Sequence, residues 1–310
     1  MHGGRDLREG ALDNMWRLDL DSVMRSCEDG SYPVQWEQIL FRGPKSPGRI
    51  SHHRCAVMGD KMILVGGLKG GEVSNTDCWL FDLKTNQWEV GKSGEEAIDD
   101  HCLVQADKNQ LVIFGGFSGG TRVNSVRSAI LTPPNKVEWT GLRGSERPSK
   151  TVPIPRNAHS AVAQGNSVFV FGGQDEDNNK MGDIWEFNIT TKQWAQINYT
   201  VTGRVTDIAR SGHAAVSYGS KMFIFGGILE VTKELNDLLV YDFKTQKLTI
   251  HEQREGGPEA LAYASKLEET IAKNSINDGA NSPHRVKTLA GSPLRKGIAG
   301  MSPNRRSTMG

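Results

Sequence analysis

The sequence predicts an all-β protein in which four-stranded blades repeat around a common axis as a β-propeller. Three observations lead to this prediction: glycine pairs that recur at blade-like spacings, apolar runs that precede them, and bulky residues at fixed offsets behind them. The pairs are spaced by 63, 49, 57 and 54 residues, which is typical of propeller blades rather than of enzyme domains. The first residues of the pairs are Gly3, Gly66, Gly115, Gly172 and Gly226.

Four of the pairs follow a short apolar run that we interpret as a buried strand. The runs are rich in β-branched and aromatic residues and end at the glycines. They occupy residues 62–65, 111–114, 168–171 and 222–225. Glycine suits the end of such a strand, because it tolerates positive φ angles and close backbone approach without steric cost.

A second strand is predicted behind the glycines by an alternation with a period of two. An Asp lies ten residues beyond the second glycine in three repeats, and bulky apolar residues follow it two and four positions later. One face of this strand is therefore expected to be buried. The residues concerned are Asp77, Trp79, Phe81, Asp183, Trp185, Phe187, Asp237, Leu239 and Tyr241.

Two further strands complete each repeat. A polar turn leads to a bulky residue 21 positions past the second glycine, namely Trp88, Trp194 or Leu248, which begins the third strand. A segment that starts with His and ends in Ala-Val precedes three of the apolar runs and supplies the fourth. Because a four-stranded sheet cannot bury both of its faces alone, the sheets are expected to pack radially on one another.

Taken in order, these residues resemble the kelch repeat: Arg-x-x-His, an apolar run, Gly-Gly, Asp-x-aromatic-x-aromatic, a turn and Trp. Repeats that begin near Arg49, Arg156 and Arg210 carry this pattern. The resemblance covers roughly residues 3 to 253 and implies a kelch-type β-propeller.

Two repeats depart from the pattern. In the third, Val126 and Ser128 stand in the Asp and Trp positions and Trp139 lies 23 positions past the glycine, so we expect a distorted outer hairpin there. The first repeat has no strands ahead of Gly3 and carries an insertion at residues 21–34. We therefore expect about four to five blades in an N-terminally incomplete propeller. The alternative is a closure that uses the N-terminal stub.

Composition divides the chain into three segments. Residues 1–253 form the predicted propeller, residues 254–278 a short amphipathic helix or linker, and residues 279–310 a disordered basic tail. The tail holds six Lys and Arg and no acidic residue. The rest of the chain has 31 basic residues against 36 acidic ones, a net charge of −5. This acidic body argues against nucleic-acid binding by the propeller.

Three Ser-Pro-x-Arg units recur at ten-residue intervals in the tail, and their serines are Ser282, Ser292 and Ser302. The units resemble sites of proline-directed kinases. Each phosphate would add about −1.5 to −2 charge, so that three would cancel most or all of the tail's charge of +6. The tail is thus a candidate electrostatic switch, which attracts an acidic partner or surface until a kinase modifies it. The alternative is a solvating tail with incidental Ser-Pro pairs.

The sequence lacks the signatures of several other protein classes. It has no run of 18 apolar residues and no apolar segment near its start that would serve as a secretory signal. Its four cysteines form no C-x-x-C motif, which suits a reducing compartment. We therefore predict a cytoplasmic protein without membrane contact, with the nucleus as the alternative location.

Catalysis is not indicated. The chain lacks the phosphate-binding glycine motifs and the nucleophile elbow of common enzymes. His53, His159 and His213 each lie 13 residues before their glycine pair, so that the fold would place them in different blades, too far apart to share a metal. We predict that each histidine hydrogen-bonds a neighbouring loop, that the protein is not an enzyme, and that it holds no metal or cofactor.

Binding is expected on the loops behind the glycine pairs, because function usually resides in loops that a rigid scaffold holds. The resemblance to kelch proteins implies a partner-binding face built from propeller loops. The leading hypothesis is a non-catalytic scaffold that binds other proteins. The alternatives are the substrate-recognition subunit of a ubiquitin ligase and the kelch portion of a larger enzyme. The candidate contacts are the basic loop residues Arg5, Arg8, Lys69, Arg122, Lys180 and Lys233.

Overall fold

The computed structural model describes residues 1–29, 34–41, 43, 45–92, 96–132, 135–144, 147, 149–202, 208–230 and 233–251. The chain divides into two units, Met1–Gln253 and Arg254–Gly310, and every described residue belongs to the first. The predicted helix or linker at 254–278 and the tail with Ser282, Ser292 and Ser302 lie outside the described residues.

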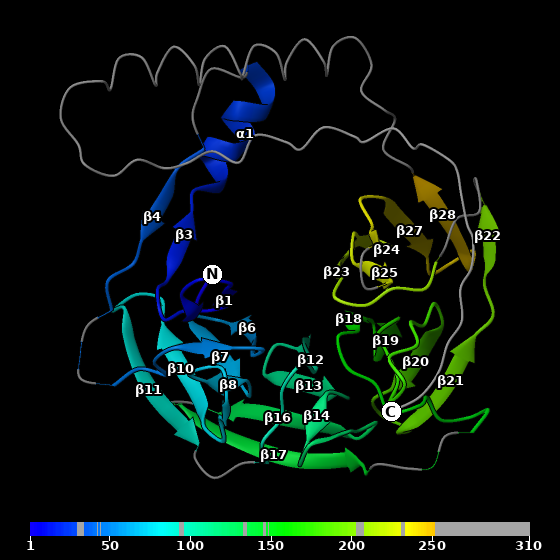
Figure 1. Cartoon of the computed structure of the whole chain (residues 1–310), viewed down its shortest axis with the longest axis horizontal. Helices are drawn as coiled ribbons and strands as arrows, with labels where there is room; N and C mark the ends of the chain where they lie inside the picture. The colour runs from blue at the N-terminus through cyan, green and yellow to red at the C-terminus, as the bar shows by residue number, and fades with distance from the viewer. Residues whose placement is uncertain are drawn as a thin grey trace, which may run out of the picture. The chain divides into compact units, whose positions relative to one another are not determined.

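The first unit is built from antiparallel sheets that correspond one by one to the sequence repeats (Figure 1). Three of these sheets are four-stranded meanders, which we number as blades 2, 3 and 4. Blade 2 comprises β6 (Arg54–Met58), β7 (Lys61–Val65), β10 (Cys78–Asp82) and β11 (Gln87–Lys92). Blade 3 comprises β12 (Cys102–Asp107), β13 (Gln110–Phe114), β16 (Val126–Thr132) and β17 (Lys136–Arg143). Blade 4 comprises β18 (Ser160–Gln164), β19 (Ser167–Phe171), β20 (Ile184–Asn188) and β21 (Gln193–Ile197).

The sheets at the two ends of the series differ from these three. Blade 5 consists of β23 (Ala214–Tyr218), β24 (Lys221–Phe225), β27 (Leu238–Asp242) and β28 (Lys247–His251), and it gains a fifth strand, β22 (Thr200–Thr202), which runs parallel to β28. Blade 1 contributes the hairpin of β3 (Trp16–Leu18) and β4 (Trp36–Gln38).

Successive blades lie side by side. The first strands of blades 2 to 5 contact one another in series, β6 with β12, β12 with β18 and β18 with β23 (Figure 1). The apolar core consists of clusters between neighbouring blades: Leu80 of blade 2 lies in one cluster with Ile113 of blade 3, and Phe171 of blade 4 in another with Leu239 of blade 5. The prediction of an all-β propeller is therefore confirmed.

One helix interrupts blade 1, and the sequence analysis did not predict it. Helix α1 (Leu20–Asp29) occupies most of the insertion between β3 and β4. Asp19 caps its start, because the Asp21 N–H donates to the Asp19 Oδ1 at 3.0 Å. Among the described residues, no helix has the length and apolar character needed to cross a bilayer.

Blade 3 departs from the predicted alignment. The register pairs Phe114 with Val126, as it pairs Phe171 with Ile184 in blade 4, so Ser125 rather than Val126 corresponds to Asp183. By the same shift, Arg127 rather than Ser128 takes the position that Trp185 occupies in blade 4. The loop ahead of β16 is one residue shorter, and this moves the strand.

The outer hairpin of blade 3 is extended, with one register shift between Val126 and Arg127. Trp139 pairs with Ala129, ten residues away, whereas Trp194 pairs with Phe187, seven residues away. The guanidinium of Arg127 lies 5.6 Å from the ring centre of Trp139, where blade 4 has a contact between two Trp rings. The expected distortion is therefore a three-residue lengthening of the hairpin.

The glycine pairs of blades 2, 3 and 4 lie between the histidines of two successive repeats. A Cβ atom added to Gly116 would stand 2.8 Å from the Cβ of His101, in its own repeat, and 2.5 Å from the Asp99 carbonyl oxygen. A Cβ on Gly115 would stand 2.6 Å from the Cε1 of His159, in the next repeat. Both glycines have positive φ angles, 64° at Gly115 and 95° at Gly116. No side chain fits here without displacing backbone, which explains why the pair recurs.

Backbone hydrogen bonds join the blades beside these glycines. The residue ahead of each histidine has a positive φ angle, and its N–H donates to the carbonyl of the equivalent residue one blade earlier. The Asp100 N–H bonds to His52, the Ala158 N–H to Asp100 and the Gly212 N–H to Ala158, at 3.0, 3.1 and 2.8 Å. A chain of equivalent bonds thus runs through blades 2 to 5.

The histidines are structural groups: His159 and His213 are buried, His53 is half-buried, and each ring hydrogen-bonds the neighbouring blade. The His159 Nε2 donates to the Phe114 carbonyl of the preceding blade at 3.0 Å, and the His53 Nε2 donates to the His2 carbonyl at 3.1 Å. Burial lowers the pKa of His53 to about 4 and that of His213 to about 3. All of these rings are therefore neutral at pH 7.

Burial also lowers the pKa of His2 to about 4, and it lowers the pKa values of His101 and His159 well below the ordinary value. Because the unfolded chain takes up protons near pH 6.5 and the folded chain does not, stability should fall as the pH drops from about 6.5 to about 4. In this range, each such histidine lowers the free energy of unfolding by up to about 1.4 kcal/mol for every unit that the pH falls. Urea unfolding at a series of pH values measures this slope, and His159→Gln should make it shallower. A flat profile between about pH 7 and 5 would contradict the account.

Candidate partner-binding loop face

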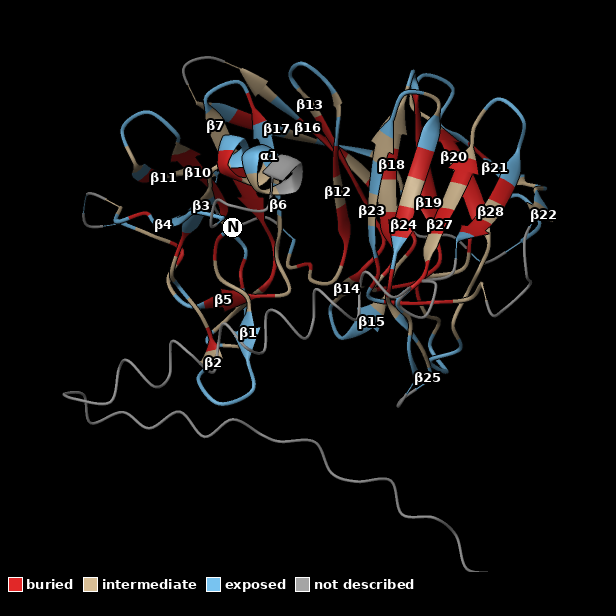
Figure 2. Cartoon of the chain, turned by 90° about the horizontal axis from the view of Figure 1, so that it is seen from above, coloured by how far each residue is buried: buried red, intermediate tan, exposed pale blue. Residues whose placement is uncertain are grey.

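The loop face is the surface formed by the five loops that follow the glycine pairs, numbered 1 to 5 along the chain. They are residues 5–13, 68–77, 117–125, 174–183 and 228–237, of which 231 and 232 are outside the described residues. Four loops contain a short hairpin: β1 (Arg5–Asp6) with β2 (Gly10–Ala11), β8 (Leu68–Lys69) with β9 (Val73–Ser74), β14 (Phe117–Ser118) with β15 (Thr121–Arg122), and β25 (Ile228–Glu230) with β26 (Lys233–Glu234). Figure 2 shows β1, β2, β14, β15 and β25 on one side of the blades.

All five loops share one base. The carbonyl of the second glycine accepts a hydrogen bond from a backbone N–H near the far end of the loop, at 2.8 to 2.9 Å in every repeat. The donors are Leu12, Asn75, Val123, Met181 and Leu235. The bond spans seven residues in loop 3 and eight in the others, in agreement with the one-residue shift in blade 3. The loops therefore differ at their tips and are alike where they meet the sheets.

Loops 4 and 5 are closed further by buried arginines. Arg156 donates to both carboxylate oxygens of Asp183 at 2.7 and 2.9 Å, and to the Gly172 carbonyl at 3.0 Å. Arg210 binds Asp237 in the same bidentate way, at 2.6 and 3.0 Å. Both arginine side chains are 0% exposed. Each clamp joins the last residue of its loop to the first glycine of the pair that precedes the loop.

In blade 2, the residue equivalent to these arginines is not the one that the sequence motif predicts. The carbonyls of Arg156 and Arg210 accept from glycine N–H groups of the preceding repeat, and in blade 2 the Ile50 carbonyl accepts from Gly4 at 2.9 Å. Ile50 rather than Arg49 is thus the equivalent residue. Asn75 compensates, because its Nδ2 donates to the Gly66 carbonyl at 2.9 Å.

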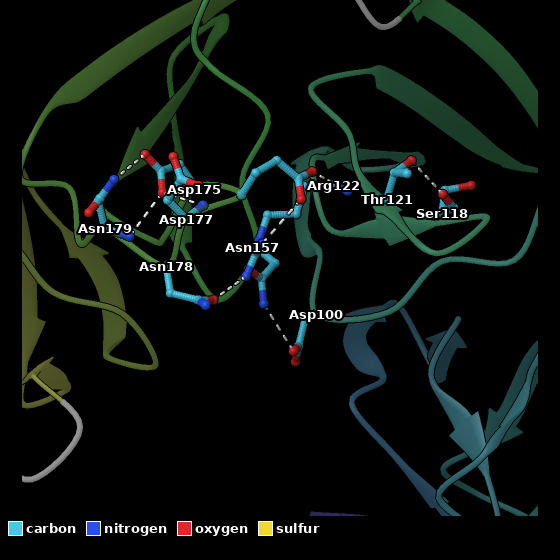
Figure 3. A network of polar contacts seen from close by, with 10 residues as sticks. Asp100, Ser118, Thr121, Arg122, Asn157, Asp175, Asp177, Asn178 and Asn179 are labelled. Atoms are coloured by element: carbon cyan, nitrogen blue, oxygen red, sulfur yellow. Dashed lines mark hydrogen bonds and ion pairs between the residues drawn. The ribbon is translucent and has the colours of Figure 1, made fainter.

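Arg122 lies where loops 3 and 4 meet (Figure 3). Its guanidinium donates to the Oδ1 atoms of Asn157 and Asn178, both at 2.6 Å, and lies 3.4 Å from the Oε2 of Glu176. Asn157 in turn donates to the Asp100 Oδ2 at 3.3 Å. Only 7% of the Arg122 side chain is exposed. The structure thus assigns this residue to fixing two loops against each other.

Loop 1 presents an apolar side chain between basic ones. The Asp6 Oδ1 accepts the N–H groups of Arg8 and Glu9 at 2.7 and 2.9 Å, and these bonds hold the pKa of the Asp6 carboxyl below its usual range. The turn projects Leu7, which is 100% exposed, with Arg5 and Arg8 exposed on either side. Sequence analysis selected the two arginines and missed Leu7, although an apolar residue within a charged run was a usable signal.

The remaining candidates occupy three different loops. The Lys69 Nζ, in loop 2, donates to Asp77 at 3.0 Å and lies 5.7 Å from the Trp79 ring centre. In loop 4, the half-buried Lys180 donates to Gln174. Lys233, in loop 5, is exposed. All six predicted contacts therefore lie on the loop face, and they differ in how much of their charge is offered to solvent.

A cavity of about 420 Å³ lies among the inner strands and is lined by Arg54, His159, Ser160 and His213, among others. The two histidines there are neutral and engaged with backbone or hydroxyl partners. Among the described residues, no cluster of His, Cys, Asp or Glu has the arrangement of a metal site.

Comparison with known proteins agrees with this architecture. The sequence matches the family model described as the KLHDC2/KLHL20/DRC7 Kelch-repeats domain over residues 1–143 and 100–267. It is 27% identical to Acyl-CoA-binding domain-containing protein 5 of Arabidopsis thaliana, over 87% of this chain and 42% of that protein.

Two animal proteins are similar to the same degree. Human Kelch domain-containing protein 10 is 27% identical over 64% of this chain and 44% of its own length. The Leucine-zipper-like transcriptional regulator 1 homolog of Drosophila melanogaster is 29% identical over 77% of this chain and 23% of its own length. The chain thus spans less than half the length of each of these relatives.

The Arg–Asp clamps give a direct prediction about loop 4. Asp183→Ala leaves the buried guanidinium of Arg156 without its counter-charge, which should lower the free energy of unfolding by about 3–5 kcal/mol. The matched control is Asp77→Ala, because Asp77 pairs with the partly exposed Lys69 and its loss should cost less than about 1 kcal/mol. Urea unfolding at pH 7 compares the two variants. Equal losses would show that burial of the arginine does not decide the strength of the clamp.

Proposed function

Since the chain belongs to the kelch-repeat family, whose repeat domain serves as a protein-interaction scaffold, we propose that it binds a partner protein through its loop face. One observation carries the proposal: the five loops share the same kind of hydrogen-bonded base and have different tips. A constant base holds the loops in place, and variable tips determine what they recognise. No chemical step is needed for this function.

Loop 1 is proposed as the main contact. A fully exposed Leu7 between exposed Arg5 and Arg8 combines an apolar anchor with two positive charges. Arginines are enriched among the residues that dominate interface energies, and burial of an exposed Leu side chain contributes about 1.5–3 kcal/mol. The partner is therefore expected to present an apolar pocket with acidic groups at its rim. Lys69, Lys180 and Lys233 are proposed as secondary contacts on loops 2, 4 and 5.

The test replaces the tip of loop 1. The double variant Leu7→Asp, Arg8→Glu should lose its partner in quantitative affinity purification, and a partner so identified should bind the purified variant at least about tenfold more weakly. The control is Lys84→Glu, in the turn that ends β10 at the other end of blade 2. A partner that is retained by the double variant and lost with Lys84→Glu would place the binding surface elsewhere.

We further propose, from the sequence of the tail, that a proline-directed kinase modifies Ser282, Ser292 and Ser302 in a cytoplasmic or nuclear protein. The tail's charge of +6 and the three equally spaced Ser-Pro-x-Arg units support the proposal. Phosphopeptide mapping across the cell cycle should find phosphate on these serines, and binding of an acidic partner should weaken as the phosphate accumulates. Three serines that stay unmodified throughout would end this part of the proposal.

A further inference from the structure

The outer face of blade 5 is the face that points away from blade 4, and its apolar side chains are the exposed Val216, Tyr218 and Phe225 and the half-buried Phe223. Phe225 is 57% exposed and Val216 is 61% exposed. Their equivalents in blade 4 occupy the same offsets from the histidine and the glycine pair, yet Phe171 is 0% exposed. Exposed apolar patches of this kind mark interaction sites.

The junctions between blades 3 and 4 and between blades 4 and 5 show which side chains cover an equivalent face. In blade 3, the equivalent Phe114 meets the Trp194 ring of the next blade, with ring centres 4.8 Å apart and the planes at 63°. In blade 4, Phe171 lies in one cluster with Leu239 and Leu248 of blade 5. At both junctions the face is thus covered by large apolar residues from the third and fourth strands of the following blade.

The hairpin of blade 1 exposes a matching set. Trp16 stands at the same offset from its glycine pair as Trp185, and Leu18 pairs with Trp36 as Phe187 pairs with Trp194. Trp36 is 48% exposed. Together with Met1, the two Trp side chains of this hairpin line an apolar hollow of about 290 Å³. The hairpin face of Trp16, Leu18 and Trp36 therefore has side chains like those of blade 4 that cover Phe114, the blade 3 equivalent of Phe225.

We propose that the hairpin face of one copy of this chain docks on the outer face of blade 5 of a second copy. The contact is head-to-tail, so each copy uses one surface as donor and the other as acceptor. Its geometry repeats the aromatic packing inside the molecule, where a Phe ahead of the glycine pair meets a Trp from the next blade. Pairing of two blade 5 faces would lack that match, because neither offers a Trp.

The experiment is sedimentation velocity on the full chain at a series of concentrations up to about 100 μM, where mass action favours association. The unaltered chain should associate reversibly. Phe225→Asp on one surface and Trp36→Asp on the other should each weaken association at least about tenfold. Leu83→Asp is the matched control, because Leu83 is an exposed apolar residue on neither surface, and it should associate as the unaltered chain does.

Mixing the two variants decides the geometry. Phe225→Asp keeps its hairpin face and Trp36→Asp keeps its blade 5 face, so an equal mixture should form a one-to-one dimer although neither variant associates alone. Circular dichroism and thermal unfolding verify that both variants fold. If Phe225→Asp does not fold, Val216→Asp replaces it on the blade 5 face. If Trp36→Asp does not fold, Trp16→Asp replaces it on the hairpin face.

Three results would overturn the proposal. The unaltered chain could remain monomeric throughout the concentration series. Trp36→Asp could associate as strongly as the unaltered chain while Phe225→Asp does not, which would indicate pairing of two blade 5 faces. The mixture could also fail to form a dimer.

Discussion

The structure depends on one steric constraint: at the three junctions between blades 2 and 5, two glycines lie where a side chain would meet backbone. A Cβ on Gly67 would stand 2.5 Å from the Ser51 carbonyl oxygen, and one on Gly66 would stand 2.1 Å from the Ile98 carbonyl oxygen. Because the chain can come this close only without side chains, the histidines of adjacent repeats approach the pair from both sides. The same close approach lets backbone hydrogen bonds run from blade to blade.

This constraint also positions the loop face. The second glycine of each pair anchors its loop through its carbonyl, and the first accepts from Arg156 or Arg210 where the clamps are present. Substitutions at the tips therefore leave the backbone hydrogen bond at the base intact, so that the same kind of base can hold loops of different chemistry. The neutral histidines lie at the junctions, the buried guanidiniums close the bases of loops 4 and 5, and the exposed charge and the apolar Leu7 lie at the tips.

Glycine spacing and strand alternation were sufficient to predict the propeller, because both patterns reflect the packing of whole sheets. Features that rest on single contacts were not accessible in this way. Ile50 replaces an arginine whose bond Asn75 supplies, and Arg127 replaces a Trp after a one-residue shift in loop 3. The six basic loop residues lie on the loop face, where binding stays a prediction, and only the structure shows that Arg122 binds a neighbouring loop. Helix α1 was missed because its sequence lies inside an insertion with no counterpart in the other repeats.

The most direct test of the junction compares two glycines that both have positive φ angles, Gly116 at 95° and Gly120 at 82°. A Cβ on Gly120 meets nothing within 4 Å, whereas one on Gly116 meets the Asp99 carbonyl oxygen. Gly120→Ala should therefore lower the free energy of unfolding by about 1–2 kcal/mol for backbone strain alone. Gly116→Ala should lose at least about 2 kcal/mol more because of the added clash. If urea unfolding gave equal losses for the two variants, close packing at the junction would not be what holds the blades together.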